Sequence, residues 1–215
     1  MNYTIRKLTY SDGRAFRYHI SDDDGNLRYV AERSGMFLPS PTYLVDFFDP
    51  DHNPSGRLQP PDVAPWRRGK RYEVFVGAEE EPYAVIQETW RLVDILLLRL
   101  PHYQVQLGEY RYTVQGSRYG GRFYEILEPS EEKEVEEVEE SEETGAVSAW
   151  PDGTFDLEKE DEEASEQERR KSVGLIRRPT AGPSYTVESD AAPLRQAPLV
   201  LASLVILIDM EMHLA

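Results

Sequence analysis

The chain has 215 residues, of which 40% are hydrophobic and 11% aromatic, so it is long enough to bury a core of its own. It contains no cysteine, which excludes disulfide bonds, thiolate metal sites, cysteine nucleophiles and S-acylation. The N-terminal sequence MNYTIRKL lacks the apolar stretch of a secretion signal. We therefore expect a folded protein of the cytosol.

The net charge of −16 comes from one segment of the chain. Between Glu128 and Glu168 there are 19 acidic and two basic residues, whereas the rest of the chain holds 21 acidic and 22 basic residues. The segment has few apolar side chains, so burial would not offset the entropy lost on ordering it. The sequence predicts a nearly neutral folded body interrupted by an acidic, disordered insertion at residues 129–171.

Most of the body alternates between apolar and polar residues with the period of a β-strand. The first strand is expected at Tyr3–Leu8, and the runs Phe16–Ile20 and Leu27–Ala31 form a hairpin around an Asp-Gly turn. Further strands are expected at Thr42–Phe48, Arg71–Val76, Tyr83–Thr89, Tyr103–Leu107, Tyr110–Gln115, Phe123–Leu127, Val173–Arg177 and Tyr185–Glu188. Many short strands separated by Gly, Pro and Asp turns indicate an antiparallel sandwich or barrel.

Two segments do not follow this alternation. Trp90–Leu100 is apolar on both faces except at three charged positions, so its period does not decide between helix and strand. Inside the insertion, two short apolar runs at Ala146–Leu157 surround a Pro-Asp-Gly turn, which predicts a small hairpin between two acidic arms. The insertion is either a solvated surface loop or a docking arm for a basic protein partner. We favour the loop, because runs of like charge are common.

The C-terminal run Ala197–Ile208 holds twelve residues without a charge and is closed by Asp209 and Glu211. A membrane-spanning helix needs about 20 apolar residues, and runs of roughly 10–14 more often form buried core helices. A helix that is apolar on every side must be enclosed by other elements. The β-branched residues of the run would also suit a central strand, but its length favours a helix. We therefore expect a barrel or sheet wrapped around a central helix at residues 193–212.

Candidate metal and phosphate motifs are weak. The loop Asp49–Asn53 alternates oxygen ligands, but Pro54 and Pro60 replace the Gly and Glu that an EF-hand requires. The acidic run at Ser21–Gly25 is better explained as the hairpin turn. Gly116–Gly121 lacks the Lys-Ser/Thr of a phosphate loop, and none of the histidines has zinc-binding spacing: His19, His52, His102 and His213. We expect no metal, no cofactor and no catalytic residue.

The best ligand candidate is a basic stretch in which four cations stand beside an indole: Trp66, Arg67, Arg68, Lys70 and Arg71. The cations would attract a phosphorylated head group, and the indole suits a membrane interface. The alternative is an ordinary solvated loop before the strand at Tyr72, in contact with the acidic insertion. Short basic clusters are frequent, so both interpretations stay open.

Several short motifs occur along the chain in an order that is similar to that of a known protein family. YHISDDDGNLRYV at Tyr18–Val30 is followed by an F-D-P…G pattern at Phe48–Gly56, VGLIRR at Val173–Arg178, Y-x-V-E at Tyr185–Glu188 and LVLASLVILID at Leu199–Asp209. This order resembles the tubby C-terminal-like superfamily, in particular its phospholipid scramblase and LURP-one-related branches. The resemblance covers the chain outside the acidic insertion. It implies a closed antiparallel β-barrel of twelve strands with the terminal helix through its centre, in one domain of residues 1–215.

The departures from the scramblase pattern guide the expected function. Scramblases carry an acylated cysteine cluster and an acidic calcium-binding segment before the last helix, whereas this chain has no cysteine and only Glu188 and Asp190 there. The LURP-one-related branch is the closer match. We expect a non-enzymatic binding or scaffold module for anionic lipid or phosphate groups at the inner face of a membrane. The alternatives are a scramblase-like membrane protein and an undetected enzyme. We expect a monomer with no membrane-spanning segment and no nucleic-acid partner.

Overall fold

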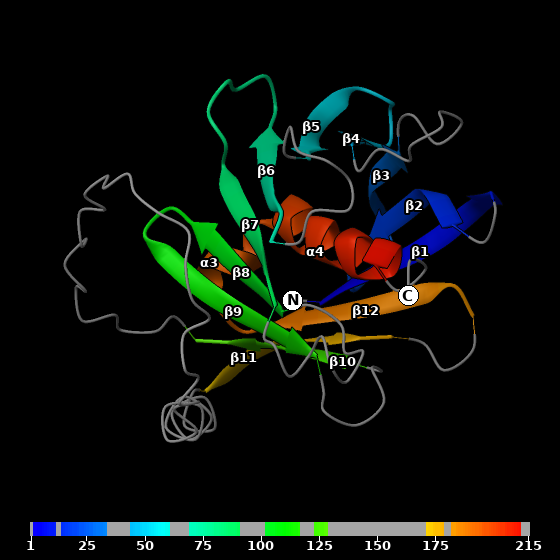
Figure 1. The fold of residues 1–215 in the computed structure, drawn as a ribbon. Helices are drawn as coiled ribbons and strands as arrows, with labels where there is room; N and C mark the ends of the chain where they lie inside the picture. Colours follow the sequence, from blue (N-terminus) through cyan, green and yellow to red (C-terminus); the bar gives the residue numbers. More distant parts are fainter. Residues whose placement is uncertain are drawn as a thin grey trace, which may run out of the picture. The chain divides into compact units, whose positions relative to one another are not determined.

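The computed structural model describes residues 2–11, 14–33, 44–60, 69–90, 102–116, 123–128, 171–178 and 182–211. Met1–Pro129 and Ser172–Ala215 belong to one compact unit (Figure 1). Its elements follow in chain order: β1 (Asn2–Ser11), β2 (Arg14–Ser21), β3 (Leu27–Arg33), β4 (Val45–Phe48), β5 (Pro54–Gln59), β6 (Arg71–Val76), β7 (Ala84–Thr89), β8 (His102–Leu107), β9 (Tyr110–Gly116), β10 (Phe123–Leu127), β11 (Ser172–Arg177), β12 (Ser184–Ser189), α3 (Ala192–Arg195) and α4 (Pro198–Glu211).

The twelve strands form a closed antiparallel barrel, which confirms the predicted fold class. Each strand pairs with its neighbours in sequence, and β1 pairs with β12 in the register Tyr3 to Val187. Closure leaves no strand edge of the ring without a partner. The ring therefore has two ends, and successive connections alternate between them because all pairs are antiparallel.

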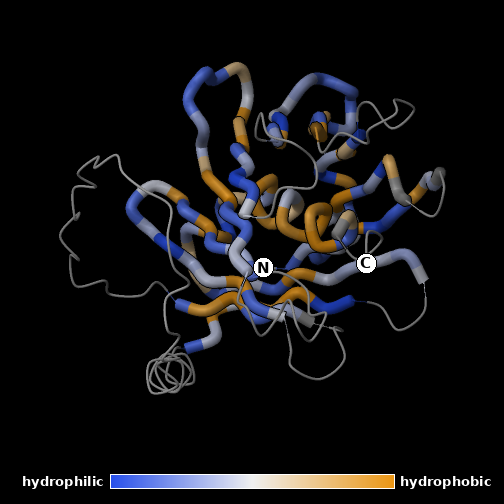
Figure 2. The backbone as a smooth tube through the Cα atoms, viewed as in Figure 1, coloured by the Kyte–Doolittle hydropathy of each residue, from blue (hydrophilic) through white to orange (hydrophobic). Residues whose placement is uncertain are grey.

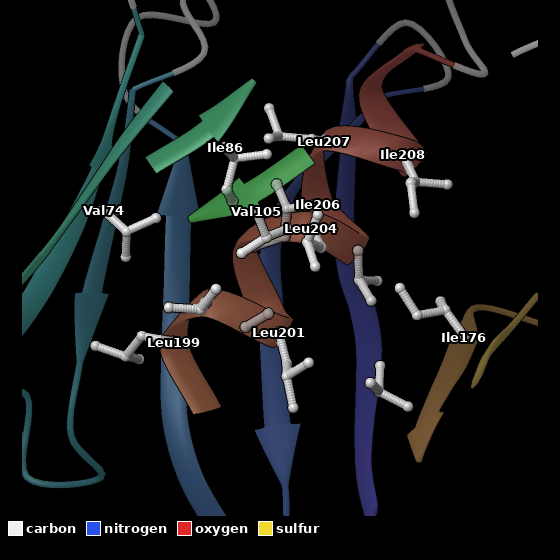
Figure 3. Close-up of a cluster of buried hydrophobic side chains, with 14 of the residues drawn as sticks. Val74, Ile86, Val105, Ile176, Leu199, Leu201, Leu204, Ile206, Leu207 and Ile208 are labelled. Carbon is white, nitrogen blue, oxygen red and sulfur yellow. The ribbon is translucent and has the colours of Figure 1, made fainter. Parts of the chain in front are cut away.

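The barrel is filled by α4. All twelve residues from Leu199 to Met210 are buried, and the helix lies inside the ring of strands (Figure 1). The helix is coloured as hydrophobic along most of its length in Figure 2. In Figure 3, Val74, Ile86 and Val105 from three strands lie around helix residues such as Leu204 and Leu207. The expected enclosed helix is thus confirmed. Within the described residues, no helix has the length and apolar content that crossing a membrane requires.

Two sequence predictions need correction. The helix expected over 193–212 is divided into α3 and α4, because Pro198 has no amide hydrogen to continue a helix and instead begins α4. Strand β5 was not predicted, because its Pro and Gly residues are typical of a loop. Gly56 is needed there: a β-carbon would lie 2.4 Å from the carbonyl oxygen of Phe75 and 2.8 Å from Cδ1 of Leu199.

Other predicted strands agree with the structure within a few residues. The strand expected at Thr42–Phe48 corresponds to β4, which begins at Val45. Residues 91–100 of the ambiguous apolar segment lie outside the described residues. The same holds for the hairpin expected at Ala146–Leu157 and for residues 129–170 of the acidic insertion.

The two ends of the barrel differ, and we name them by what they contain. The helix-exit end is the one at which α4 finishes, and the strands β1, β3, β5, β7, β9 and β11 also end there. The hairpin end holds the connections β2–β3, β4–β5, β6–β7 and β8–β9, together with the link from β12 to α4.

Candidate functional site

All buried Lys, Arg, Asp and Glu residues among those described lie at the helix-exit end. Arg33 ends β3, Lys70 immediately precedes β6, Glu88 is the last residue but one of β7, and Asp209 is near the end of α4. Lys7 on β1 joins them, since its side chain is only 11% exposed. We call these five residues the polar cap. It covers the apolar core at one end of the barrel.

Asp209 is the centre of a buried hydrogen-bond network. Its Oδ1 accepts hydrogen bonds from Nζ of Lys7 and from the hydroxyl of Tyr185, both at 2.7 Å. Its Oδ2 accepts one from the hydroxyl of Tyr18 at 3.0 Å. One cation and two hydroxyl donors thus replace the water that the carboxylate loses on burial. Since the donors come from β1, β2 and β12, the network fastens the end of α4 to three strands.

The two tyrosines of this network are held in the protonated form. Burial raises the pKa of the Tyr18 hydroxyl well above its usual value of 10.0, and the negative charge of Asp209 raises it further, while nearby Arg33 acts in the opposite direction. Burial and Asp209 also raise the pKa of Tyr185. Both hydroxyls therefore donate at neutral pH. Both oxygens of Asp209 are engaged, so this network is suited to holding the helix rather than to acid–base chemistry.

Glu88 fastens the end of the predicted basic stretch. Its Oε2 accepts a hydrogen bond from the backbone N–H of Lys70 at 3.1 Å, and its Oε1 accepts one from the indole N–H of Trp90 at 2.5 Å. The backbone N–H of Glu88 donates to the carbonyl of Lys70 at 2.8 Å, and the amide of Gln87 donates to the carbonyl of Gly69 at 2.9 Å. The main chain at Gly69–Lys70 is therefore fixed to β7.

The structure describes two of the five predicted ligand residues. Lys70 is buried, with 8% of its surface exposed, at a position inside the barrel end. Arg71 begins β6, and its exposed guanidinium lies 3.9 Å from the carboxylate of Glu73. Trp66, Arg67 and Arg68 lie outside the described residues. What the structure brings together is thus one exposed cation and one buried lysine, both at the helix-exit end.

The two acidic loops use their carboxylates within their own turns. Asp49 accepts hydrogen bonds from the backbone N–H of Asn53 at 2.7 Å and from its side-chain amide at 2.9 Å. These bonds lower the pKa of Asp49. Asp22 accepts in the same way from Asn26, with its backbone N–H at 2.8 Å. The described residues contain no group of three or more His, Asp or Glu side chains arranged for a metal ion.

The polar cap was not predicted, although the sequence carried a signal for it. Glu88 continues the buried alternation of Ala84 and Ile86 along β7, and Lys7 follows Tyr3 and Ile5 on the inward positions of β1. A charged residue on the inward side of a predicted strand needs a buried partner. Asp209 gave the matching signal, because it directly follows a run that must be enclosed.

The fold and the cap together define a β-barrel closed around a helix whose end is held by buried charges. No family model and no curated protein matches the sequence. Among solved structures, the X-ray structure of the Arabidopsis thaliana protein AT5G01750 is similar, with a TM-score of 0.50 and 13% sequence identity. The match covers 97% of this chain and 90% of that one. At this identity the likeness supports the barrel fold and carries no statement about function.

Proposed function

We propose that the protein is a non-enzymatic binding module of the LURP-one-related branch of the tubby-like superfamily. The order of motifs along the chain supports this branch, and the closed barrel around a buried helix agrees with the fold that the resemblance implies. The ligand is an anionic, phosphate-bearing group, presented by a lipid head group at the cytoplasmic face of a membrane. The residues that hold it are Trp66, Arg67, Arg68, Lys70 and Arg71.

The interior of the barrel supports a role at its surface. The side chains of α4 and of the strands fill the space around Leu199–Ile208 mostly with apolar groups, so a charged ligand has no favourable place beside this part of the helix. The buried carboxylates Asp209 and Glu88 each hold donors on both oxygens. Neither is a free general base, and this favours binding over acid–base catalysis by these two groups.

The observation that carries the proposal is the fixed main chain at Gly69–Lys70. The hydrogen bonds to Glu88 and Gln87 hold the end of a basic stretch in place before any ligand arrives. A segment that is already ordered loses less conformational entropy on binding. Arg71, whose guanidinium is exposed, directly follows this fixed segment in the chain. A bound anion would therefore pair with Arg71 next to a main chain that is already ordered.

Co-sedimentation with vesicles tests the proposal. The chain is mixed with phosphatidylcholine vesicles, with vesicles that also contain phosphatidylserine or a phosphoinositide, and, in a separate calorimetric arm, with inositol phosphate and inorganic phosphate. Each cation near an anionic surface contributes about 1 kcal/mol, so Arg67→Glu with Arg68→Glu should weaken vesicle binding by more than about tenfold. Removing residues 129–171 should strengthen it, because the insertion is strongly acidic.

A matched control reverses two exposed arginines of the hairpin end, Arg28→Glu with Arg195→Glu, and changes the net charge equally. It should lose much less affinity than the basic-stretch variant. Binding to soluble phosphates but not to vesicles would identify a free phosphate as the ligand. Equal loss in both variants, or no binding to any anionic probe, would overturn the proposed site.

A further inference from the structure

A row of polar side chains crosses three strands on the outer face of the barrel. β12, β1 and β2 lie side by side (Figure 1), and Arg6 on β1 pairs with Ser184 of β12 and with His19 of β2. Tyr18 and Ile20, which flank His19 along β2, are fully buried, so His19 points outward. Arg6 is exposed and His19 is half-buried. A ligand can therefore reach this row from the solvent.

The row is basic and contains no carboxylate. Arg17 stands two positions before His19 on the same face of β2, so the imidazole has one arginine along its strand and another across from it. Glu32 on the neighbouring β3 is already bonded to Arg17, at 2.8 Å. Arg6 has no hydrogen bond or ion pair with any other residue in the part of the chain that the structure describes. Its guanidinium is thus available to an anion.

His19 is sensitive to the charge of whatever binds beside it. Burial lowers the pKa of His19 below its usual value of 6.5, and the positive charges of Arg17 and Arg6 lower it further. On β3, the other neighbouring strand, the outward charged residues are Arg28 and Glu32. Like charges opposite each other on neighbouring strands repel, so the imidazole is mostly neutral at pH 7. A bound anion would offset the two arginines and favour its protonated form.

We infer that Arg6 and His19 form an oxyanion site for a phosphate monoester on the outer face of β1 and β2. Directly opposed residues of two strands have β-carbons about 4.5–5.5 Å apart, so one tetrahedral anion can contact both side chains. The guanidinium offers paired N–H donors, and the imidazolium and the hydroxyl of Ser184 offer further donors. The site shares no residue with the basic stretch Trp66–Arg71, so it goes beyond the proposed function and does not rest on it.

NMR titration of the imidazole C–H resonances tests the site, because it gives the pKa of each histidine separately. Sulfate is the probe, since it stays dianionic over the range in which histidine titrates. At saturating sulfate, the pKa of His19 should be about one unit higher than in chloride of the same ionic strength. By linkage, sulfate should then bind about tenfold more tightly to the protonated than to the neutral imidazole. His52, exposed in the turn between β4 and β5, is the internal control and should titrate equally in both salts.

Arg6→Gln removes the cation opposite His19. In chloride it should raise the pKa of His19, because one of the two repelling charges is gone, and it should abolish the additional rise in sulfate. Arg57→Gln is the matched control, since it removes the same charge at an exposed position on β5 and should leave both results unchanged. Both variants alter exposed side chains, so the apolar core is kept.

Two further probes at constant pH distinguish the sources of the phosphate group. Glycerol phosphate and phosphatidic acid in phosphatidylcholine vesicles carry the same monoester. A shift of the His19 resonances with the soluble ester, without retention on the vesicles, would identify a free phosphate as the ligand. Retention on the vesicles that Arg6→Gln weakens about fivefold would identify a lipid head group.

The site is refuted if the pKa of His19 is the same in sulfate and chloride, or if Arg6→Gln keeps the sulfate-specific rise. Loss of that rise in Arg57→Gln as well would also overturn it, because net charge alone would then explain the effect. The vesicle test of Arg67→Glu with Arg68→Glu concerns the basic stretch only. Failure of that test and failure of this one are therefore separate results.

Discussion

Replacing Asp209 by Asn tests the buried network that holds the end of α4. The substitution keeps the size of the side chain but removes the negative charge that Lys7 meets at 2.7 Å. Removing one partner of a buried ion pair costs about 3–5 kcal/mol, because the other charge stays buried without compensation. Since 11% of the Lys7 side chain is exposed, we expect the lower value, about 3 kcal/mol. For a body of this size, that lowers Tm by about 6–12 °C.

Thermal unfolding followed by circular dichroism measures this loss. Lys7→Met added to Asp209→Asn removes the uncompensated cation and should restore at least half of the lost stability. Glu32→Gln is the control for a more exposed pair, since Arg17 and Glu32 are 2.8 Å apart with 45% and 31% of their side chains exposed, and it should cost less than about 1 kcal/mol. If Asp209→Asn unfolds at the wild-type temperature, or if the double variant is no better than the single one, the reasoning about this pair is wrong.

Four further outcomes follow from the core, the insertion and the tyrosines. Leu204→Asp places an unpaired charge in the barrel and should abolish cooperative unfolding, whereas Leu204→Ala should only cost about 2–5 kcal/mol in denaturant titrations. A Gly/Ser linker in place of residues 129–171 should leave a soluble, β-rich chain with a nearly neutral isoelectric point, and a non-cooperative transition would show that the segment contributes to the core. Gly56→Ala should cost about 1–3 kcal/mol through the close approach to Phe75, and a neutral effect would contradict that packing. The pKa values of Tyr18 and Tyr185 are raised in the folded state, so their contribution to the free energy of unfolding is complete below pH 10.0 and is lost at higher pH as the tyrosines of the unfolded chain ionise. In denaturant titrations at alkaline pH, Tyr18→Phe and Tyr185→Phe should each lose less stability with rising pH than the wild-type chain does.

The sequence was sufficient for the architecture because two periodicities are strong in it. Alternating residues such as Tyr103, Val105 and Leu107 place one side of each strand inward, and the terminal run has no polar side to leave in water. Together they allow little besides strands around a helix. Strand β5 was not predicted because Pro54 and Gly56 are typical of loops. Gly56 is required by its close approach to Phe75 and Leu199, and this contact is not visible in the sequence.

The candidate site was harder to predict, because its residues come from distant parts of the sequence and are brought into contact only by the fold. Lys7 and Asp209 are separated by 202 positions, and nothing local in the sequence joins them. Lys70 belonged to the predicted basic stretch, yet the structure buries it and fixes its main chain to Glu88. Sequence proximity therefore grouped Lys70 with Arg71, two residues whose surroundings in the fold differ. Arg71 is exposed where Lys70 is enclosed.

The buried charges of the polar cap have a physical origin in the fold itself. The last carbonyl groups of α4 carry the negative end of the helix dipole, so buried cations such as Lys7 and Arg33 are favoured near the helix C-terminus. Asp209 opposes that dipole, which is why it needs a cation and two hydroxyl donors.

The exposed acidic turns cannot be explained in this way. The field of a helix end falls off within one turn and is screened by salt, so Glu79, Glu80 and Glu81 gain little from the N-terminus of α4. Asp22 and Asp49 have a structural role, since each binds the amide groups of its own turn. The three glutamates are exposed in a turn whose shape does not require a carboxylate. Their charge acts on what approaches the barrel from outside.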